Sequence, residues 1–477
     1  MAQFEATWES LQQYNCPQWF RDAKFGIWAH WGPQCFPMVG DWYARNMYIE
    51  GHQQYDHHVR TYGHPSKFGY KDIVKLWKAE KFDPEGLMDL YKNSGAKYFV
   101  SMAIHHDNFD LWDSKHHNWN ATKMGPGRDV VGEWAKAARA AGLRFGVTEH
   151  LERTYSWFNT NKGSDKTGPY AGVPYDGNDP EYADFYVEQH DDTLSVYPEN
   201  PSEAWTKHWQ ARIMDLIDQH DPDLLYTDGG VPFQNIGREM VAHLYNRSVE
   251  RRGQLESVYA LKDPRRHQGT HPEHHGSFVD GFATLDVERG VIDGISDEPW
   301  QTDTCLGGWF YDSRREYKTP EKVVHMLADI VSKNGNLLLN APQRPDGTLD
   351  DQCEWIVKQI GAWMSVNGEA IYETRPWKVY GEGPTTFAAS TFAEKEEREF
   401  TGDDFRFTSK GDTIYAIAMG KPVNGGWLIR SLAGHEAKDV ALLGIDSVNW
   451  QNTPAGLWVE APASLPCEFA WSIRVDL

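Results

Sequence analysis

The sequence predicts an α/β fold: a (β/α)8-like TIM barrel followed by a C-terminal antiparallel β-sandwich. Short apolar segments typical of buried strands alternate with helical segments up to residue 341, which is the pattern of βα units. About seven or eight strand segments can be counted there, close to the number that a closed barrel needs. After residue 365 helical segments give way to short alternating ones, such as 413–418, separated by Gly, Asn and Pro.

The elements of the predicted barrel follow a helical lead-in over residues 1–20. Strands are expected at 24–32, 97–104, 143–149, 223–228, 257–261 and 335–340, and the segments 282–290 and 299–304 lie between the last two. Helical spacing predicts helices at 70–95, 132–141, 205–220, 238–251 and 319–333. Residues 155–200, rich in Gly, Pro, Asp and Tyr, are expected to form a long loop of the kind that builds a site.

The change in sequence pattern also sets the predicted domain boundary. It falls around residues 366–376, near Val366-Asn-Gly368. The expected domains are therefore a barrel over residues 1–365 and a sandwich over residues 366–477.

Composition narrows the classes of partner. The formal net charge of the 477 residues is -22, which argues against nucleic acid or an anionic membrane surface and favours a neutral ligand. The 21 Trp and 22 Tyr suit the flat C–H faces of sugars, although a large aromatic core would also account for them. No apolar run approaches 18 residues, so no membrane span is expected.

The cysteines and the N-terminus carry little functional signal. The five cysteines are scattered and form no CxxC motif, so we expect a fold that does not depend on disulfides. The N-terminus Met-Ala-Gln-Phe-Glu lacks the basic-then-apolar pattern of a signal peptide, which is compatible with a leader removed earlier. The sequence predicts neither the compartment nor the oligomeric state.

Asp228 is the first candidate catalytic residue. It ends the strand segment Asp223-Leu-Leu-Tyr-Thr-Asp, and Gly229-Gly230 interrupts the strand directly afterwards. In a parallel α/β barrel, reactive side chains lie at the C-terminal ends of strands, where the loops build the site. An isolated Asp-Gly would more often cap a turn, but polar residues collect at the other predicted strand ends as well: His30, Trp42, His105, His106, Glu149, His150 and Glu288.

Residue spacing separates the chemical classes. The histidine pairs at 57–58, 105–106, 116–117 and 274–275 show no HExxH spacing, and adjacent strand residues point to opposite faces, so no metal site is expected. No Gly-x-Ser-x-Gly elbow or phosphate-binding loop is present. The remaining chemistry is that of paired carboxylates, which with aromatic residues and histidine donors suits glycoside cleavage.

Several motifs carry a family resemblance that covers nearly the whole chain in order. WFRDAKFGIWAHWG (19–32) resembles the opening signature of the family 29 α-L-fucosidases. DWYARNM (41–47), HHDNFD (105–110), SKNGNLLLNAP (332–342) with PDG (345–347), and RPWKVYGEG (375–383) resemble later motifs of that family. The resemblance implies a retaining exo-hydrolase that acts on terminal α-L-fucose of glycans, without metal or organic cofactor.

The resemblance also implies roles for individual residues. The nucleophile falls on Asp228, within YTDG (226–229), where many members carry Trp at the position of Tyr226. The acid/base is assigned to Glu288 in DVERG (286–290), with Glu298 and Glu149 as rivals. Trp300 is expected to cover the carboxylates. The expected substrate-binding residues are His30, Trp42, His105, His106, Glu149, His150, Tyr226 and Trp300, with His150 standing where other branches carry Tyr.

Two alternatives to the fucosidase stay open at this point. An α-L-galactosidase would act on a sugar that is fucose plus one hydroxyl, and a hydrophobic pocket rejects an added hydroxyl only modestly. A non-catalytic fucose-binding relative would lack one carboxylate, whereas Asp228 and Glu288 are both present. The resemblance further suggests a secreted, periplasmic or lysosomal protein.

Overall fold

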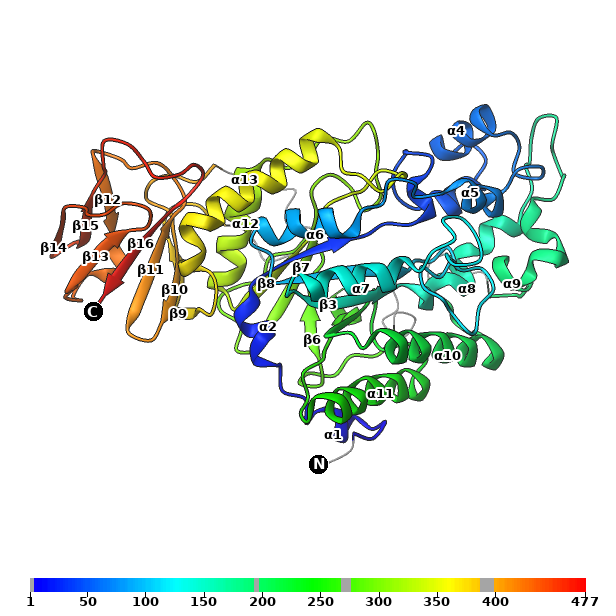
Figure 1. Ribbon diagram of the computed structural model, residues 1–477, viewed down its shortest axis with the longest axis horizontal. Coiled ribbons are helices and arrows are strands. Elements are labelled where there is room, and N and C mark those ends of the chain that lie inside the picture. The colour runs from blue at the N-terminus through cyan, green and yellow to red at the C-terminus, as the bar shows by residue number, and fades with distance from the viewer. Residues whose placement is uncertain (1–3, 193–196, 267–275, 387–398) are drawn as a thin grey trace.

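The computed structural model describes residues 4–192, 197–266, 276–386 and 399–477, and its centre is a closed parallel barrel (Figure 1). The strands of the barrel follow sequence order around it, β1 to β8, and β8 pairs with β1. The predicted fold class is confirmed. The strands are β1 Phe25–Ala29, β2 Tyr98–Ile104, β3 Arg144–Glu149, β4 Leu224–Thr227, β5 Val258–Lys262, β6 Thr284–Asp286, β7 Trp300–Cys305 and β8 Gly335–Asn340.

The barrel strands are buried on both faces, which explains their nearly continuous apolar sequences. In β1 (FGIWA), β4 (LLYT) and β8 (GNLLLN), all residues are buried. Trp28, Tyr98, Tyr226 and Leu338 pack together in one cluster of the core. Such side chains fill a barrel, so it forms a packed core whose loops are free to build a site at the C-terminal ends of the strands.

Helices surround the barrel, and side chains before their first turns explain where several of them begin. Asp129 accepts a hydrogen bond from the backbone of Gly132 at the start of α7, and Ser202 caps α10 in the same way. Pro320 occupies the first turn of α12, where its missing N–H costs nothing. The longer helices are α6 Pro84–Asn93, α7 Val130–Ala140, α10 Glu203–His220, α11 Asn235–Arg252, α12 Pro320–Ser332 and α13 Asp351–Asn367.

The structure differs from the expected alternation in two places. The predicted helix at 70–95 is two helices, α5 (Tyr70–Leu76) and α6. The described residues between β5 and β6, and between β6 and β7, contain no α-helix. The β6–β7 connection is only 13 residues long and includes Gly290, Gly294 and Pro299, which disfavour a continuous helix.

Short helices and loops gather at the end of the barrel opposite the C-terminal sheets (Figure 1). These helices are α3 Tyr43–Asn46, α4 Gln53–Thr61, α5, α8 Thr154–Trp157 and α9 Ala183–Tyr186. Asp176 ties two of the loops together, because it accepts hydrogen bonds from Tyr48 and Tyr186 and pairs with Lys71 at 3.2 Å. The region 155–200, expected to be a loop, therefore contains short helices and is anchored by buried polar contacts.

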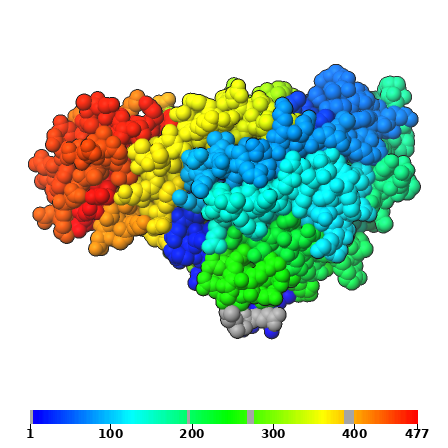
Figure 2. Space-filling model, in the orientation of Figure 1, coloured from blue at the N-terminus to red at the C-terminus, as the bar shows by residue number. Residues whose placement is uncertain are grey.

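Two antiparallel sheets follow the barrel and form a separate lobe (Figure 2). One sheet has the order β13-β16-β11-β10-β9 and the other β12-β15-β14, and their facing residues share an apolar core around Phe407, Trp427 and Ile473. The strands are β9 Arg375–Glu382, β10 Phe405–Lys410, β11 Thr413–Ala418, β12 Gly426–Ile429, β13 Asp439–Leu442, β14 Trp450–Thr453, β15 Gly456–Glu460 and β16 Trp471–Asp476.

The predicted domain boundary at residues 365/366 falls within the last turn of α13 and stays a prediction. Two short helices precede the barrel in place of the helical lead-in, α1 Trp8–Leu11 and α2 Gln18–Ala23. Among the helices that the structure describes, none is both long and apolar enough to cross a bilayer.

Candidate active site

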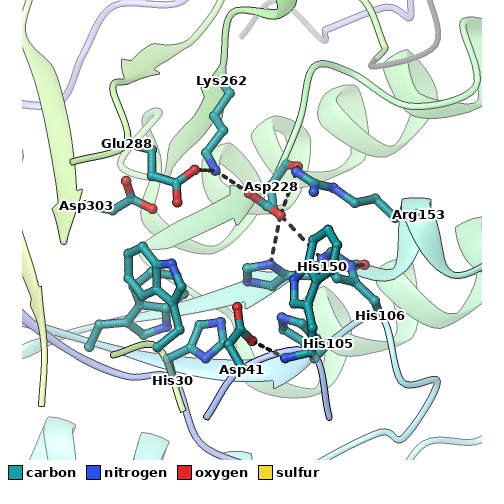
Figure 3. A pocket seen from close by; sticks show the side chains of 13 residues that line it. His30, Asp41, His105, His106, His150, Arg153, Asp228, Lys262, Glu288 and Asp303 are labelled. Atoms are coloured by element: carbon teal, nitrogen blue, oxygen red, sulfur yellow. Dashed lines mark hydrogen bonds and ion pairs between the residues drawn. The ribbon is translucent and has the colours of Figure 1, made fainter. Parts of the chain in front are cut away.

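A polar cavity of about 220 Å³ lies at the C-terminal ends of the barrel strands (Figure 3). This volume equals that of about seven water molecules, a size that suits one sugar ring. Side chains from the ends or following loops of seven strands, β1 to β7, converge on the cavity. Its lining residues are Trp28, His30, Asp41, Trp42, His105, His106, His150, Arg153, Asp228, Lys262, Glu288, Asp303 and Trp309.

Asp228 directly follows β4, and the glycines after it allow a close approach of neighbouring loops. A Cβ atom on Gly230 would lie 2.8 Å from Pro264 and 2.9 Å from the backbone of Gly276, closer than real Cβ atoms come. The backbone oxygen of Asp228 accepts hydrogen bonds from Arg153 and Tyr197, each at 3.0 Å. The turn that carries this carboxylate is therefore fixed from both sides.

The carboxylate of Asp228 contacts two cations and two imidazoles (Figure 3). Lys262 Nζ contacts Oδ1, and Arg153 Nη2 lies 2.9 Å from Oδ2. His150 Nδ1 and His106 Nε2 lie 3.4 and 3.6 Å from the same Oδ2. Burial alone would raise the pKa of Asp228, but the charges of Arg153 and Lys262 and the bond from His150 hold it well below its usual range. Asp228 is thus an ionised, buried carboxylate.

Glu288 lies two residues after β6 and is joined to Asp228 through Lys262. Lys262 Nζ donates to Glu288 Oε2 at 2.5 Å while it also contacts Asp228. Since one ammonium group binds both carboxylates, their bonded oxygens lie no farther apart than two hydrogen-bond lengths, about 5–6 Å. Retaining glycosidases hold their two carboxyl groups about 5–5.5 Å apart.

Four buried histidines form the opposite wall of the cavity. Burial lowers the pKa of His30, His105 and His106 well below the usual range, and it also lowers that of His150. These imidazoles are therefore neutral near pH 7 and offer one donor and one acceptor each. His30 Nδ1 has no hydrogen-bond partner in the part of the chain that the structure describes, and a buried group of this kind calls for a polar ligand.

The same cluster contains two sets of potential metal ligands. The ligand atoms of His30, His105 and His150 lie within 4.8 Å of one another, as do those of His106, His150 and Asp228. Neutral imidazoles suit a metal, but Arg153 and Lys262 already bring two positive charges to Asp228, which disfavours a cation beside it. The His-rich segment 271–275, weighed as a metal ligand from sequence, lies outside the described residues.

Aromatic rings complete the cavity. Trp42 adopts a left-handed backbone conformation with φ 61°, which is uncommon for a bulky residue and often marks a functional position. The centre of its indole ring lies 6.2 Å from the centre of the His106 imidazole ring. Trp309 and Trp28 are 5.2 Å apart, and both line the cavity beside His30. One side of the cavity is therefore apolar, as a sugar with a C–H face requires.

The structure brings together most of the predicted site residues: Asp228, Glu288, His30, Trp42, His105, His106 and His150 all line the cavity. Glu149 does not, because it points out of the barrel, where Thr227 and Trp209 donate hydrogen bonds to it. Tyr226 lies in the layer of the barrel interior below the cavity and donates to Asp303 at 3.1 Å.

Trp300 is a correction to the expected site. It is the first residue of β7, at the N-terminal end of the barrel, and its indole N–H donates to the backbone of Lys333. The expected cover of the carboxylates therefore cannot come from Trp300, whereas Trp309 does line the cavity. Glu298, a rival for the acid/base, precedes the same strand end and is exposed.

Lining residues that sequence reasoning missed include most of the charged ones: Asp41, Arg153, Lys262 and Asp303. Lys262 carried the same signal as Asp228, since it is a charged residue that ends an apolar strand. Asp41 adjoins Trp42, and burial raises its pKa to about 7. Arg153 lies in a loop and had no signal of its own, because only folding brings it to Asp228.

Comparisons with known proteins agree with this geometry. A family model described as "Alpha-L-fucosidase" matches residues 1–369, and one described as "Alpha-L-fucosidase C-terminal domain" matches residues 398–476. Plasma α-L-fucosidase of Homo sapiens is 30% identical over 492 residues, covering 99% of this chain and 92% of its own. Tissue α-L-fucosidase of Homo sapiens is 28% identical over 484 residues, covering 98% and 91%.

Solved structures show the same similarity. The Thermotoga maritima α-fucosidase in complex with fucose is 26% identical, with a TM-score of 0.75 and coverage of 99% of this chain and 100% of its own. The α-L-fucosidase isoenzyme 1 of Paenibacillus thiaminolyticus is 22% identical, with a TM-score of 0.69 and coverage of 96% and 98%, which supports the fold alone.

Proposed function

Because the chain belongs to the α-L-fucosidase family, we propose that it hydrolyses terminal α-L-fucose from fucosylated oligosaccharides or glycoconjugates with retention of configuration. The observation that carries this proposal is the pair of carboxylates joined by one ammonium group: Asp228 and Glu288 both contact Lys262. Contact with one ammonium group keeps the two carboxylates close enough together to support a double displacement.

Asp228 is proposed as the nucleophile. Arg153 and Lys262 keep it ionised, and the two contacts orient both of its oxygens. Attack on the anomeric carbon forms a covalent fucosyl-enzyme and releases the leaving group. Water then attacks the same carbon and displaces the Asp228 carboxylate, which frees the enzyme. Two inversions give net retention.

Glu288 is proposed as the acid/base, which protonates the departing oxygen and then removes a proton from the attacking water. Proton donation requires Glu288 to give up its contact with Lys262. A glycosidic oxygen that enters between the two carboxylates would replace Lys262 as the hydrogen-bond partner of Glu288. The neutral histidines would hold the ring hydroxyls, and the tryptophans would cover the apolar face.

The nucleophile is tested with Asp228→Ala. We expect turnover of an aryl α-L-fucoside to fall by at least roughly 10³-fold in a folded protein, because the covalent route is lost. A 2-deoxy-2-fluoro-fucosyl reagent should label Asp228 in the wild type, and NMR of the reaction should show α-L-fucose as the first product. Near-normal activity of Asp228→Ala, or β-L-fucose as first product, would contradict the proposal.

The acid/base is tested with Glu288→Ala. Turnover of substrates with poor leaving groups should fall by roughly 10²-fold or more. Turnover of activated aryl fucosides should fall far less, because a good leaving group needs little protonation. Azide should restore turnover and give α-L-fucosyl azide, since a small anion attacks the β-linked fucosyl-enzyme without a base and inverts the anomeric carbon a second time. Glu298→Ala and Glu149→Ala serve as matched controls, and azide rescue in either of them would transfer the role to that residue.

A further inference from the structure

A hydrogen-bond chain behind the cavity fixes the orientation of the Gln34 side-chain amide. Gln34 lies in the short 3-10 helix η1 (Pro33–Cys35), is completely buried and does not line the cavity. The backbone N–H of Ala44 donates to Gln34 Oε1 at 3.2 Å. Because this contact assigns the oxygen, the other end of the amide, Nε2, is the atom that lies 2.7 Å from His105 Nδ1.

This contact selects the tautomer of His105. An amide nitrogen donates hydrogen bonds and does not accept them, so His105 Nδ1 must be an acceptor without a proton. Burial, with the neighbouring histidines, lowers the pKa of His105 and keeps the ring neutral. The proton therefore sits on Nε2, and His105, which lines the cavity, offers an N–H donor to a ligand.

The next residue has the opposite arrangement. His106 Nδ1 lies 2.5 Å from the backbone oxygen of His150, and a carbonyl only accepts, so this nitrogen carries the proton. His106 Nε2 is then a lone pair, and it faces Asp228 Oδ2 at 3.6 Å. Two acceptors that face each other at this distance favour a ligand group that donates between them.

We propose that Gln34 is a positioning residue that fixes His105 as a hydrogen-bond donor, so that His105 and His106 read sugar hydroxyls with opposite polarity. His105 binds a hydroxyl oxygen that accepts, and His106 with Asp228 binds a hydroxyl that must donate. This inference rests on the proposed function and specifies the substrate class further. A sugar that is sulfated or alkylated at the hydroxyl bound by His106 has no proton to donate there and is excluded.

The first test measures binding of free L-fucose to the wild type, so that no bond cleavage complicates the result. Isothermal titration calorimetry compares L-fucose with its 2-, 3- and 4-deoxy and deoxyfluoro derivatives, because fluorine accepts weakly and never donates. At the hydroxyl bound by His105, the deoxy sugar should bind about tenfold more weakly than L-fucose, and the fluoro sugar should bind more tightly than the deoxy sugar. At the hydroxyl bound by His106, the fluoro and the deoxy sugar should both bind about tenfold more weakly than L-fucose. If the fluoro and deoxy sugars bind equally at all three positions, the proposal fails.

The second test observes the proton directly. In protein labelled with 15N at histidine, two-bond 1H–15N spectra distinguish the tautomers, and His105→Asn identifies the His105 signals. We expect a protonated Nε2 and a bare Nδ1 in the wild type, and a mixture in Gln34→Met, which removes the donor at similar volume. The difference between fluoro and deoxy sugars should narrow in the same variant.

Gln343→Met is the matched control, because Gln343 is also a buried glutamine outside the cavity lining, but its amide donates to the backbone oxygen of Gly347 and not to a histidine. It should leave both the tautomer and the sugar preferences unchanged. A wild-type spectrum with the proton on Nδ1, or a Gln34→Met spectrum identical to that of the wild type, would overturn the proposal. The spectra need no sugar, so they separate a failure of this proposal from a failure of the proposed function.

Discussion

At the scale of single residues, Lys262 determines the charge balance of the cavity. It is the last residue of β5, is 4% exposed, and contacts both Asp228 and Glu288. Burial alone would lower the pKa of Lys262, but the two carboxylates raise it well above its usual value. A permanently charged lysine therefore separates the two proposed catalytic groups and keeps the nucleophile ionised.

Lys262→Met should shift the pH dependence in a defined direction. Loss of the ammonium group raises the pKa of Asp228, and activity requires Asp228 to be ionised, so it falls as the pH drops through that pKa. We expect the acidic limb of kcat/KM, which reports the free enzyme, to move to higher pH, with a loss of roughly tenfold or more at pH 7. Lys262→Arg keeps the charge and should leave the limb near its wild-type position. An unmoved limb in Lys262→Met would mean that Lys262 only shapes the cavity.

Whether a site residue could be predicted from the sequence depends on whether it adjoins a strand end or lies farther along a loop. Asp228, His105 and His150 come directly after apolar strands, and the sequence pattern alone places them at one end of the barrel. Arg153 depends on the path of a loop, which the pattern does not describe. Trp300 was misplaced because a strand has two ends, and only the direction of β7 shows that this residue lies at the end away from the cavity.

At the scale of elements, the strands were more predictable than their connections. β8 begins and ends where the pattern expected, because its apolar run is bounded by polar residues on both sides. β6 is only three residues long, Thr284–Asp286, and Glu288 just after it already lines the cavity. The alternation of strand and helix fails after β6 because the connection to β7 contains Gly290 and Gly294, which disfavour a continuous helix.

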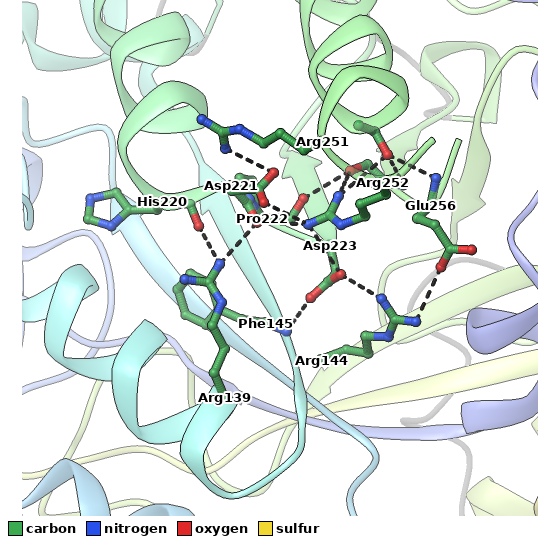
Figure 4. Close-up of polar contacts among 12 residues, drawn as sticks. Arg139, Arg144, Phe145, His220, Asp221, Pro222, Asp223, Arg251, Arg252 and Glu256 are labelled. Atoms are coloured by element: carbon green, nitrogen blue, oxygen red, sulfur yellow. Dashed lines mark hydrogen bonds and ion pairs between the residues drawn. The ribbon is translucent and has the colours of Figure 1, made fainter. Parts of the chain in front are cut away.

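The N-terminal end of the barrel contains a cluster of charges whose centre is Asp223 (Figure 4). This residue is 6% exposed, and its carboxylate accepts from the backbone of Phe145 at 3.0 Å and from Arg144 at 2.9 Å. Arg252 from α11 lies 3.5 Å away. The cluster therefore joins the starts of β3 and β4 to a helix, at the face of a barrel that serves stability.

Asp223→Ala should destabilise the fold without a large effect on catalysis. It leaves the buried N–H of Phe145 without its acceptor and removes one partner each from Arg144 and Arg252, which costs about 2–4 kcal/mol. We expect a lower apparent Tm in thermal melts and a kcat within about twofold of the wild type at 25 °C. Arg251→Ala is the control, because Arg251 pairs with Asp221 near the surface and such pairs contribute about 0–1 kcal/mol. Equal Tm values for the two variants would refute this account of the cluster.

At the scale of the whole molecule, the five-stranded sheet is a middle layer between the barrel and the second sheet. Tyr415 and Ile417 of β11 belong to the same apolar cluster as the barrel, while Ile414 and Ala416 face the sandwich core. The indole N–H of Trp363 on α13 donates to the backbone of Ala470 at 2.8 Å. Figure 2 shows the C-terminal lobe, in orange and red, directly against the yellow segment that contains α13. Both faces of β11 are thus buried, and the lobe is part of the stability of the barrel.

A buried ion pair crosses the same interface. Arg406 of β10 donates to Asp329 of α12 at 2.5 Å, and Lys333 lies 3.0 Å from the same carboxylate. Arg406 also packs over Phe400 and Tyr380. Burial alone would raise the pKa of Asp329, but Arg406 and Lys333 hold it below its usual range, so the pair is ionised at pH 7.

A double-mutant cycle measures how strongly this pair couples the two parts. Arg406→Met should cost about 3–5 kcal/mol of unfolding free energy, because Asp329 loses its main partner while it stays buried. Asp329→Asn alone should also destabilise, since it leaves Arg406 charged and unpaired. The double variant should be more stable than the sum of the single losses predicts, by about 1–3 kcal/mol, because neither charge is then left without the other. Urea titrations of the four proteins give the coupling. Strict additivity would show that the lobe is held by its apolar contacts alone, with the ion pair contributing nothing beyond its two separate side chains.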